Sequence, residues 1–282
     1  MIDLHTHSTY SDGTCIPAEL IAQAQQLGLS AVALCDHNTV GGLPEFLAAA
    51  QGSGVEAIPG VEFSTEYEGT ELHILGLFIP SEHYKTVTEL LDEMLAEKER
   101  SNRELIQALN GVGIELDYDL LRAENPDGVI NRAVIAAEMV RRGYVSSVKE
   151  AFSRWLGEKC GYYRPPRRLG SLDTIRFIRS IGAVSVLAHP FLDLDESALR
   201  RFLRDAAEYG LDGMETRYPK FDAQTTELAR QIAGEYGLLE SGGSDFHGEN
   251  KPDIELGTGR GDLFVPEEIL TELKARKNLI DF

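Results

Sequence analysis

Most of the histidines in this chain lie within, at the end of, or just past a segment that is expected to form a β-strand. His5 and His7 stand two residues apart in the first such segment, so both side chains project from one face, about 6–7 Å apart at the backbone. Two imidazoles in this arrangement can chelate one metal ion. Asp245 and His247 repeat the two-residue spacing near the end of the chain. His83 falls outside the pattern, and we expect it on the surface.

Further groups that can bind a cation follow the same pattern, namely Asp12, Asp36, His37, Glu62, His73 and His189. Each has an ordinary explanation when taken alone. A strand-end histidine such as His189 is more often a hydrogen-bonding residue than a ligand, and Asp36 could cap a turn. Burying all of these groups together without a cation would cost several kcal/mol per group. Histidine and carboxylate ligands without a thiolate suit Zn²⁺, Mn²⁺ or Fe²⁺.

Alternating strand and helix segments would position these side chains. The expected strands are Ile2–His7, Ala31–Asp36, Glu56–Glu62, Leu72–Ile79, Ala183–His189, Gly213–Thr216 and Leu238–Ser244. The expected helices are Pro17–Leu27, Leu43–Ser53, Leu172–Ile181, Glu196–Tyr209 and Thr225–Tyr236. Repeated β-then-α units predict an α/β fold with a parallel sheet, either doubly wound or closed as a barrel. The C-terminal strand ends form the functional rim of both, so residues far apart in sequence can converge there.

Residues 81–170 interrupt this alternation. No strand is expected there, and charged helical patterns dominate, at Thr86–Asn110, Arg132–Arg142 and Ser147–Leu156. The stretch ends in the proline-rich segment Tyr162–Arg168, which holds a dense basic group. We interpret residues 81–170 as a helical insertion domain that covers the site, within a main domain formed by residues 1–80 and 171–282.

Composition narrows the class of protein. The chain has 282 residues and a formal net charge of −19, which disfavours extensive binding of duplex nucleic acid but leaves small anionic substrates open. Its apolar windows are too short to span a membrane, and the N-terminus does not resemble a signal peptide. The three cysteines are odd in number and form no CxxC pair, which indicates a reducing, cytoplasmic location rather than a disulfide framework.

Six short motifs make the interpretation more specific. They are His5-Thr6-His7-Ser8, Ser11-Asp12-Gly13, Asp36-His37-Asn38-Thr39, Pro59-Gly60-Val61-Glu62, Ala188-His189-Pro190 and Gly243-Ser244-Asp245-Phe246-His247. With these motifs the chain resembles the PHP (polymerase and histidinol phosphatase) superfamily over nearly its whole length. The resemblance implies a distorted, TIM-like (β/α)7 barrel that holds three divalent metal ions at its C-terminal face. Mn²⁺ is the expected ion, with Zn²⁺ or Fe²⁺ as alternatives.

The resemblance also implies which residues bind the ions. Carried over by motif, the three ligand sets are His5, His7, Glu62 and Asp245 for the first ion, the bridging Glu62 with His73 and His189 for the second, and Asp12, His37 and His247 for the third. His73 has the weakest support, because no fixed motif surrounds it.

Within the superfamily the chain is similar to small bacterial phosphoesterases with a helical insert, typified by 3′,5′-nucleotide bisphosphate phosphatases and a related 5′-to-3′ exoribonuclease. In that group an arginine of the insert faces the barrel, and Asn131–Ala136 matches its motif loosely. Arg132 is therefore the candidate catalytic phosphate clamp, with an ordinary helix-surface arginine as the alternative. Arg164, Arg167 and Arg168 are a second candidate group for binding substrate, with a solvated hinge as their alternative.

The expected reaction is hydrolysis of phosphate monoesters of small nucleotides, such as 3′,5′-bisphosphonucleotides, by a metal-activated water. The proton for the leaving oxygen could come from water or from a site histidine, with His189 and His247 as candidates. Two other activities stay open: a 5′-3′ exonuclease on short oligoribonucleotides, and a histidinol-phosphate phosphatase, which the insert disfavours. A non-catalytic, metal-stabilised structural or sensing module is the fourth alternative, and the complete ligand set disfavours it. We expect a monomer without membrane partners.

Overall fold

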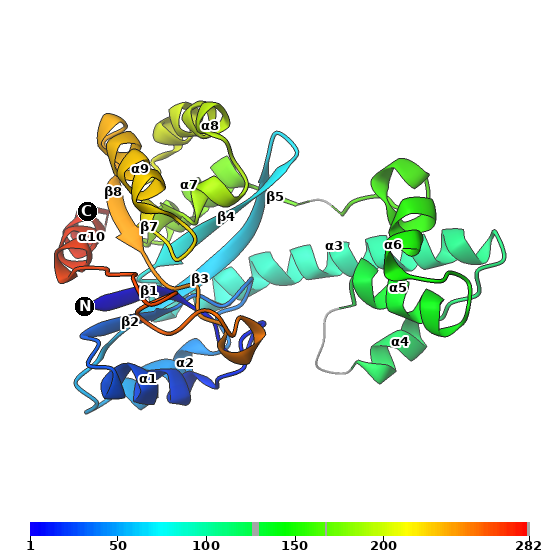
Figure 1. Cartoon of the computed structure of the whole chain (residues 1–282), viewed down its shortest axis with the longest axis horizontal. Helices are drawn as coiled ribbons and strands as arrows, with labels where there is room; N and C mark the ends of the chain where they lie inside the picture. Colours follow the sequence, from blue (N-terminus) through cyan, green and yellow to red (C-terminus); the bar gives the residue numbers. More distant parts are fainter. Residues whose placement is uncertain (126–129, 167, 281–282) are drawn as a thin grey trace. The chain divides into compact units, whose positions relative to one another are not determined.

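The computed structural model describes residues 1–125, 130–166 and 168–280 (Figure 1). It divides into two compact units. Met1–Glu89 and Leu169–Phe282 together form the first, which we call the barrel unit, and Leu90–Arg168 form the second, the insertion unit. Among the described residues, no helix combines the length and the apolar character that crossing a membrane requires.

The barrel unit is built on a mixed sheet that is nearly closed. Its strands are β1 (Ile2–Thr6), β2 (Ala31–Leu34), β3 (Glu56–Tyr67), β4 (Thr70–Leu77), β5 (Leu169–Gly170), β6 (Val184–Leu187), β7 (Gly213–Arg217) and β8 (Leu239–Gly242). They follow the order β1-β2-β3-β4-β6-β7-β8, and the short β5 pairs with β3 outside that path. The two ends meet where Thr6 bridges to Phe246 and the Asp245 amide donates to the His5 carbonyl at 2.8 Å. The predicted distorted seven-stranded barrel is confirmed.

The expectation of an all-parallel sheet is wrong at β4, which runs antiparallel to both β3 and β6. The reason is the connection between β3 and β4, which consists of Glu68 and Gly69 alone. Both have positive φ, 50° and 81°, as the central residues of a tight hairpin turn do. Parallel strands need a crossover of a dozen residues or more, so a two-residue connection makes the pair antiparallel. The expectation of no strand in residues 81–170 is also wrong for β5, whose two residues are too few to show a period.

Helices surround the sheet at the positions expected from the 3.6-residue pattern. In the barrel unit they are α1 (Pro17–Gln26), α2 (Leu43–Ala50), α7 (Ser171–Ser180), α8 (Glu196–Tyr209), α9 (Ala223–Glu235) and α10 (Glu267–Ile280), with 3₁₀ turns at Ser81–His83, Pro190–Leu192 and Gly248–Asn250. The first helix begins at Pro17 and ends before Gly28, which adopts φ 71°. The pattern did not predict α10, yet its Ile269, Leu270 and Leu273 belong to the same buried cluster as Leu4 of β1.

The insertion unit is helical and has a core of its own. Its elements are α3 (Tyr84–Asn110), which begins in the barrel unit, α4 (Tyr118–Glu124), α5 (Arg132–Arg141), α6 (Val148–Ala151) with a π-helical turn at Phe152–Leu156, and a 3₁₀ turn at Glu158–Cys160. Leu105, Leu109, Ile135 and Met139 are among its buried core residues. A separate core of this kind is what lets an inserted segment fold as a unit.

Charge is divided unequally between the two units. Residues 90–168 contain 13 lysines and arginines and 13 aspartates and glutamates, so their formal charge is zero. The remaining residues contain 14 basic and 33 acidic side chains and account for the whole net charge of −19. Within residues 1–89, Lys85 is the only lysine or arginine.

Candidate metal centre

Glu62, on β3, is the centre of a cluster of imidazoles at the C-terminal ends of the parallel strands. Its side chain is fully buried. The five nearest ring nitrogens lie 3.2 Å (His5 Nε2), 3.2 Å (His7 Nε2) and 3.1 Å (His37 Nδ1) from its Oε2, and 2.8 Å (His73 Nδ1) and 3.1 Å (His189 Nε2) from its Oε1. His73 can join the cluster from the start of its strand because β4 runs antiparallel, so its first residues lie where the parallel strands end.

Two further carboxylates complete the cluster from the loops. Asp245 Oδ1 lies 3.2 Å from His7 Nε2 and 3.7 Å from His5 Nε2. Asp12 Oδ1 lies 3.2 Å from His247 Nε2, and its Oδ2 lies 3.9 Å from His37 Nε2. The fold therefore brings all the predicted ligands to one place, although they come from almost the whole length of the barrel unit.

Three subsets of these residues have ligand atoms within 4.8 Å of one another: His7, Asp12, His37 and His247; His5, His7 and Asp245; and His37, Glu62 and His73. The subsets resemble the predicted ligand sets, but the shared residues differ. His7 and His37 each belong to two of the subsets, whereas only Glu62 was predicted to belong to two sets. His189 is in none of the three, yet it contacts Glu62. The assignment of residues to individual ions stays a prediction.

The buried polar atoms of the cluster fit divalent cations. Six of them have no hydrogen-bond partner within the described part of the chain: His5 Nε2, His7 Nδ1 and Nε2, His37 Nδ1, Glu62 Oε2 and His189 Nδ1. Buried polar atoms are rarely left unpaired, because each one loses its hydration without compensation. Three of these atoms, His5 Nε2, His7 Nε2 and His37 Nδ1, lie 3.1–3.2 Å from a fourth, Glu62 Oε2, so bound cations would satisfy them together.

Hydrogen bonds on the far side of two rings aim their lone pairs at the cluster. His5 Nδ1 lies 3.0 Å from Glu215 Oε1, and His247 Nδ1 lies 2.8 Å from the Asp245 carbonyl oxygen. A carboxylate or carbonyl oxygen can only accept, so Nδ1 carries the proton and Nε2 presents a lone pair. This is the usual arrangement of a histidine that binds a metal.

Charges inside the cluster are strongly coupled. Burial by itself would raise the pKa of Glu62, but the imidazoles of His5, His37 and His73 outweigh it and hold that pKa well below its ordinary value. Burial lowers the pKa of His37 to about 4. Burial by itself would lower the pKa of His73, but the carboxylates of Glu62 and Glu71 together outweigh it and raise that pKa to about 10. Glu62 is therefore an anion at neutral pH, as a bridging ligand has to be.

Sequence reasoning did not predict Glu215, which supports two of the candidate ligands. It is fully buried on β7, and besides His5 it binds the backbone amide of His189, which donates to Oε2 at 2.7 Å. The sequence feature that could have identified Glu215 is its position as a carboxylate inside the expected strand segment 213–216. Asp36 acts as the turn residue considered from the sequence: it accepts hydrogen bonds from the Ser8 amide and from the hydroxyls of Ser8 and Ser11.

Backbone strain and close approach are concentrated at this rim. His189 and Asp245 have φ of 28° and 56°, a region that side chains other than glycine seldom adopt. Gly243 approaches the first strand so closely that a Cβ there would lie 2.4 Å from the His5 nitrogen. Such conformations persist only where the surrounding structure enforces them, and they are common at functional sites.

The candidate arginines belong to the insertion unit. The Arg132 guanidinium carbon lies 4.0 Å from the centre of the Tyr163 ring, and its Nη1 donates to the Leu156 carbonyl at 3.3 Å. Arg132 is thus stacked on an aromatic ring rather than extended from a helix surface. Arg164 accepts a hydrogen bond at its carbonyl from Ser101, and Arg167 lies outside the described residues. Contact of Arg132, Arg164 or Arg168 with a phosphate stays a prediction.

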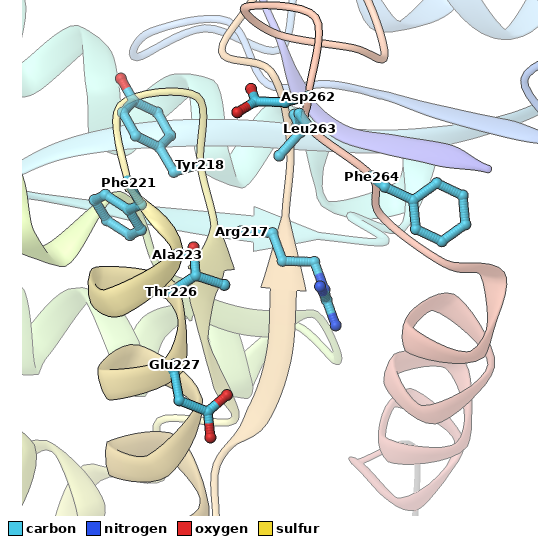
Figure 2. Close-up of a pocket in the computed structure, with 9 residues that line it drawn as sticks. All are labelled: Arg217, Tyr218, Phe221, Ala223, Thr226, Glu227, Asp262, Leu263 and Phe264. Carbon is cyan, nitrogen blue, oxygen red and sulfur yellow. The ribbon is translucent and has the colours of Figure 1, made fainter.

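A cavity of about 300 Å³ lies next to the cluster, between the start of α9 and the segment before α10. It is lined by Arg217, Tyr218, Phe221, Ala223, Thr226, Glu227, Asp262, Leu263 and Phe264. Figure 2 shows the Tyr218 ring at one end, with its hydroxyl pointing away from Arg217 and the α9 residues. That hydroxyl donates to Asp245 Oδ2 at 2.8 Å, so the Tyr218 side chain lies between the cavity and the ligand cluster.

Known proteins share both the sequence and the fold. The model of the PHP domain family matches residues 3–157. The chain is 37% identical over 250 residues to a 5′-3′ exoribonuclease of Haemophilus influenzae, covering 87% of this chain and 89% of that protein. It is 30% identical over 280 residues to the 3′,5′-nucleoside bisphosphate phosphatase of Chromobacterium violaceum, covering 98% and 97%. The solved structure of an amidohydrolase from the same organism, with bound sulfate, aligns with a TM-score of 0.73 at 28% identity and covers 98% of this chain and 96% of that one.

Proposed function

The chain belongs to the PHP domain family of metal-dependent phosphoesterases, and we propose that it hydrolyses phosphate monoesters of small nucleotides such as 3′,5′-bisphosphonucleotides. One observation carries the proposal. Histidine side chains with ring nitrogens that lack hydrogen-bond partners among the described residues surround the buried Glu62, whose own Oε2 also lacks one. A phosphoesterase needs such a set of ligands to hold cations beside an anionic substrate.

We propose that three divalent ions bind here, Mn²⁺ first, with Zn²⁺ or Fe²⁺ as alternatives. The ligand sets are those implied by the motifs: His5, His7, Glu62 and Asp245; Glu62, His73 and His189; Asp12, His37 and His247. When bound, such ions lower the pKa of a water molecule and neutralise charge on the phosphoryl oxygens. The wholly oxygen and nitrogen ligand set is compatible with each of these metals.

The residues of the chain have separable tasks in this reaction. Glu62 faces five imidazoles and would bridge two ions. Glu215 fixes the ring of His5 so that Nε2 faces inward. The carbonyl oxygen of Asp245 orients the ring of His247 in the same way, so we propose that His247 acts as a metal ligand rather than as the proton donor. Of the two candidate proton donors, only His189 has a buried Nδ1 without a hydrogen-bond partner among the described residues, so we propose this nitrogen as the donor.

Binding of a substrate phosphate requires positively charged side chains. The barrel unit is strongly acidic, whereas the insertion unit has as many basic as acidic side chains. Residues 145–168 contain six basic and two acidic side chains, in a chain whose net charge is −19. We propose that Arg132, Arg164 and Arg168 bind substrate phosphate and that the insertion covers the site during the reaction. Guanidinium groups pair bidentately with phosphate oxygens, which suits this task.

The decisive experiment removes metal with a chelator and restores Mn²⁺, Zn²⁺ or Fe²⁺ one at a time, with adenosine 3′,5′-bisphosphate as substrate. We expect phosphate and AMP to be released only after a metal is restored. Glu62→Gln should abolish turnover, while His83→Ala, which changes a histidine outside the cluster, should not alter it. No metal-dependent release by a folded wild-type protein would refute the proposal.

A second activity is supported by the 37% identity to an exoribonuclease of Haemophilus influenzae. A 5′-3′ exonuclease acting on short oligoribonucleotides would use the same metal centre. The two activities are separated by comparing kcat/KM for adenosine 3′,5′-bisphosphate with that for a 5′-phosphorylated pentaribonucleotide. Preference for the pentaribonucleotide would make the exonuclease the main function.

The cysteines bear on the cellular location of the protein. The three cysteines are free, as is ordinary in the reducing cytoplasm. We propose a cytoplasmic monomer, and light scattering coupled to size-exclusion chromatography tests its mass against the 31.1 kDa of one chain.

A further inference from the structure

The two oxygens of Asp245 have different surroundings. Oδ1 faces the cluster, 3.2 Å from His7 Nε2. Oδ2 faces away and accepts two hydrogen bonds, from the Tyr218 hydroxyl at 2.8 Å and from the Lys251 ammonium at 2.6 Å. The side chain of Asp245 is 6% exposed, so water does not compete freely for either oxygen.

The two donors come from separate parts of the chain. Tyr218 follows β7 directly, and Lys251 follows the 3₁₀ turn Gly248–Asn250. Tyr218 is 4% exposed, and its ring centre lies 5.3 Å from that of Phe221. Packing therefore fixes the direction of the hydroxyl, which Figure 2 shows pointing away from Arg217 and the residues of α9. The side chain of Lys251 is more exposed, at 33%, and places a positive charge next to the Asp245 carboxylate in an otherwise acidic unit.

We propose that Tyr218 and Lys251 are positioning residues for the metal centre, which hold Asp245 through Oδ2 so that Oδ1 alone can bind an ion. The inference rests on the proposed function, which makes Asp245 a ligand. A carboxylate oxygen has about two lone-pair sites, and both sites of Oδ2 are occupied by these donors. Without them, the Asp245 side chain could rotate or offer both oxygens to the ion.

Supporting residues of this kind are measurable in metal affinity. Loss of an outer partner of a ligand typically weakens metal binding about 10–100-fold. We expect Tyr218→Phe and Lys251→Met each to weaken Mn²⁺ binding by about 10-fold or more. The loss should fall on one of the binding events in calorimetry of the metal-stripped full-length protein. The absorption spectrum of the Co²⁺-substituted protein should also change in both variants, because the geometry of the bound carboxylate changes.

The chain offers a matched control for each variant. The Tyr67 hydroxyl donates to Asp205 and the Lys274 ammonium to Glu56, in exposed pairs that repeat the two kinds of bond elsewhere on the barrel unit. Tyr67→Phe and Lys274→Met should leave Mn²⁺ affinity and the Co²⁺ spectrum unchanged. Lys251→Arg, which keeps the charge and the donor, should recover part of the affinity lost in Lys251→Met.

The outcomes separate this inference from the proposed function. If the wild-type protein binds no divalent ion, the proposed function fails and the inference fails with it. If the wild type binds ions and hydrolyses substrate, but both variants bind Mn²⁺ within twofold of it with an unchanged Co²⁺ spectrum, the inference alone is overturned. Equal losses in the control variants would also overturn it, since the effect would then be general. Unfolding of the metal-free variants at the wild-type midpoint would show that the fold is intact.

Discussion

Asp3 ties the first strand to the end of the last one, and replacing it by asparagine should open this junction. The buried carboxylate accepts four hydrogen bonds. Oδ1 accepts from the Ser244 amide at 2.9 Å and the His5 amide at 3.3 Å, while Oδ2 accepts from the Ser244 hydroxyl at 2.5 Å and the Gly257 amide at 2.8 Å. Asparagine offers one acceptor oxygen, so its amide group would meet two of these donors, and of the four only the Ser244 hydroxyl can rotate to accept instead.

The size of the effect follows from these bonds. Hydrogen bonds to a charged group contribute about 1.5–3 kcal/mol each, so losing two costs about 3–6 kcal/mol. Burial raises the pKa of Asp3, which shows that keeping the charge buried is itself unfavourable. The neutral amide removes that cost, and the Ser244 hydroxyl can accept from it, so we expect the loss of one bond, about 2 kcal/mol.

Urea unfolding of the metal-free protein, followed by far-UV circular dichroism, measures this loss. Circular dichroism is the appropriate probe because the single tryptophan, Trp155, lies in the insertion unit. Asp253→Asn is the control: its carboxylate pairs with Arg260 at the surface, and the expected change is within about 0.5 kcal/mol. A loss below about 1 kcal/mol in Asp3→Asn, or an equal loss in the control, would refute the reasoning.

Three other predictions follow from single features. Gly243→Ala should lower the free energy of unfolding by about 1–3 kcal/mol, because its Cβ would lie 2.4 Å from the His5 nitrogen; urea unfolding checks this, with Gly234→Ala as the control, at an exposed glycine of α9 whose Cβ would meet no atom within 4 Å. Burial raises the pKa of Asp212 above 3.8 in the folded protein. The protonated carboxyl therefore contributes to the free energy of unfolding below pH 3.8, and this contribution is lost as the pH rises through the pKa of the folded state. Asp212→Asn should therefore gain stability relative to wild type as the pH rises above 3.8, and a pH-independent difference would contradict this. Finally, adenosine 3′,5′-bisphosphate should change the fluorescence of Trp155, whose ring centre lies 5.4 Å from that of Tyr162; an unchanged spectrum at saturating substrate would argue against binding at the insertion unit.

The sequence was sufficient to predict that these side chains lie together, because the signal for each of them is local. Each candidate ligand lies within, at the end of, or just past a strand that is recognisable by its apolar run, and parallel strand ends converge whatever the order of the strands in the sheet. The hairpin at Glu68 and Gly69 was missed for a related reason. A strand segment shows its period but not its direction, and only the length of the connection sets the direction.

The supporting residues could not be predicted in the same way. Glu215, Tyr218 and Lys251 act through contacts with residues between 6 and 210 positions away, and nothing in their own neighbourhood marks those partners. Their role depends on which lone pair of a ligand is already occupied. That is a property of three-dimensional packing, so it becomes visible only when both oxygens of Asp245 can be examined separately.

The hydrogen bond between Ser101 and the Arg164 carbonyl has a consequence for the order of folding. Leu77 of β4 pairs with Val184 of β6, so pairing of these two strands has to close a loop of about a hundred residues. The cost of closing a flexible loop grows with its length, by about 0.6 kcal/mol per doubling. If the insertion folds first, this bond brings α3 and the returning chain together and shortens the segment that still has to close. Early formation of the insertion would then accelerate pairing of β4 with β6, and destabilising its core would slow refolding of the barrel.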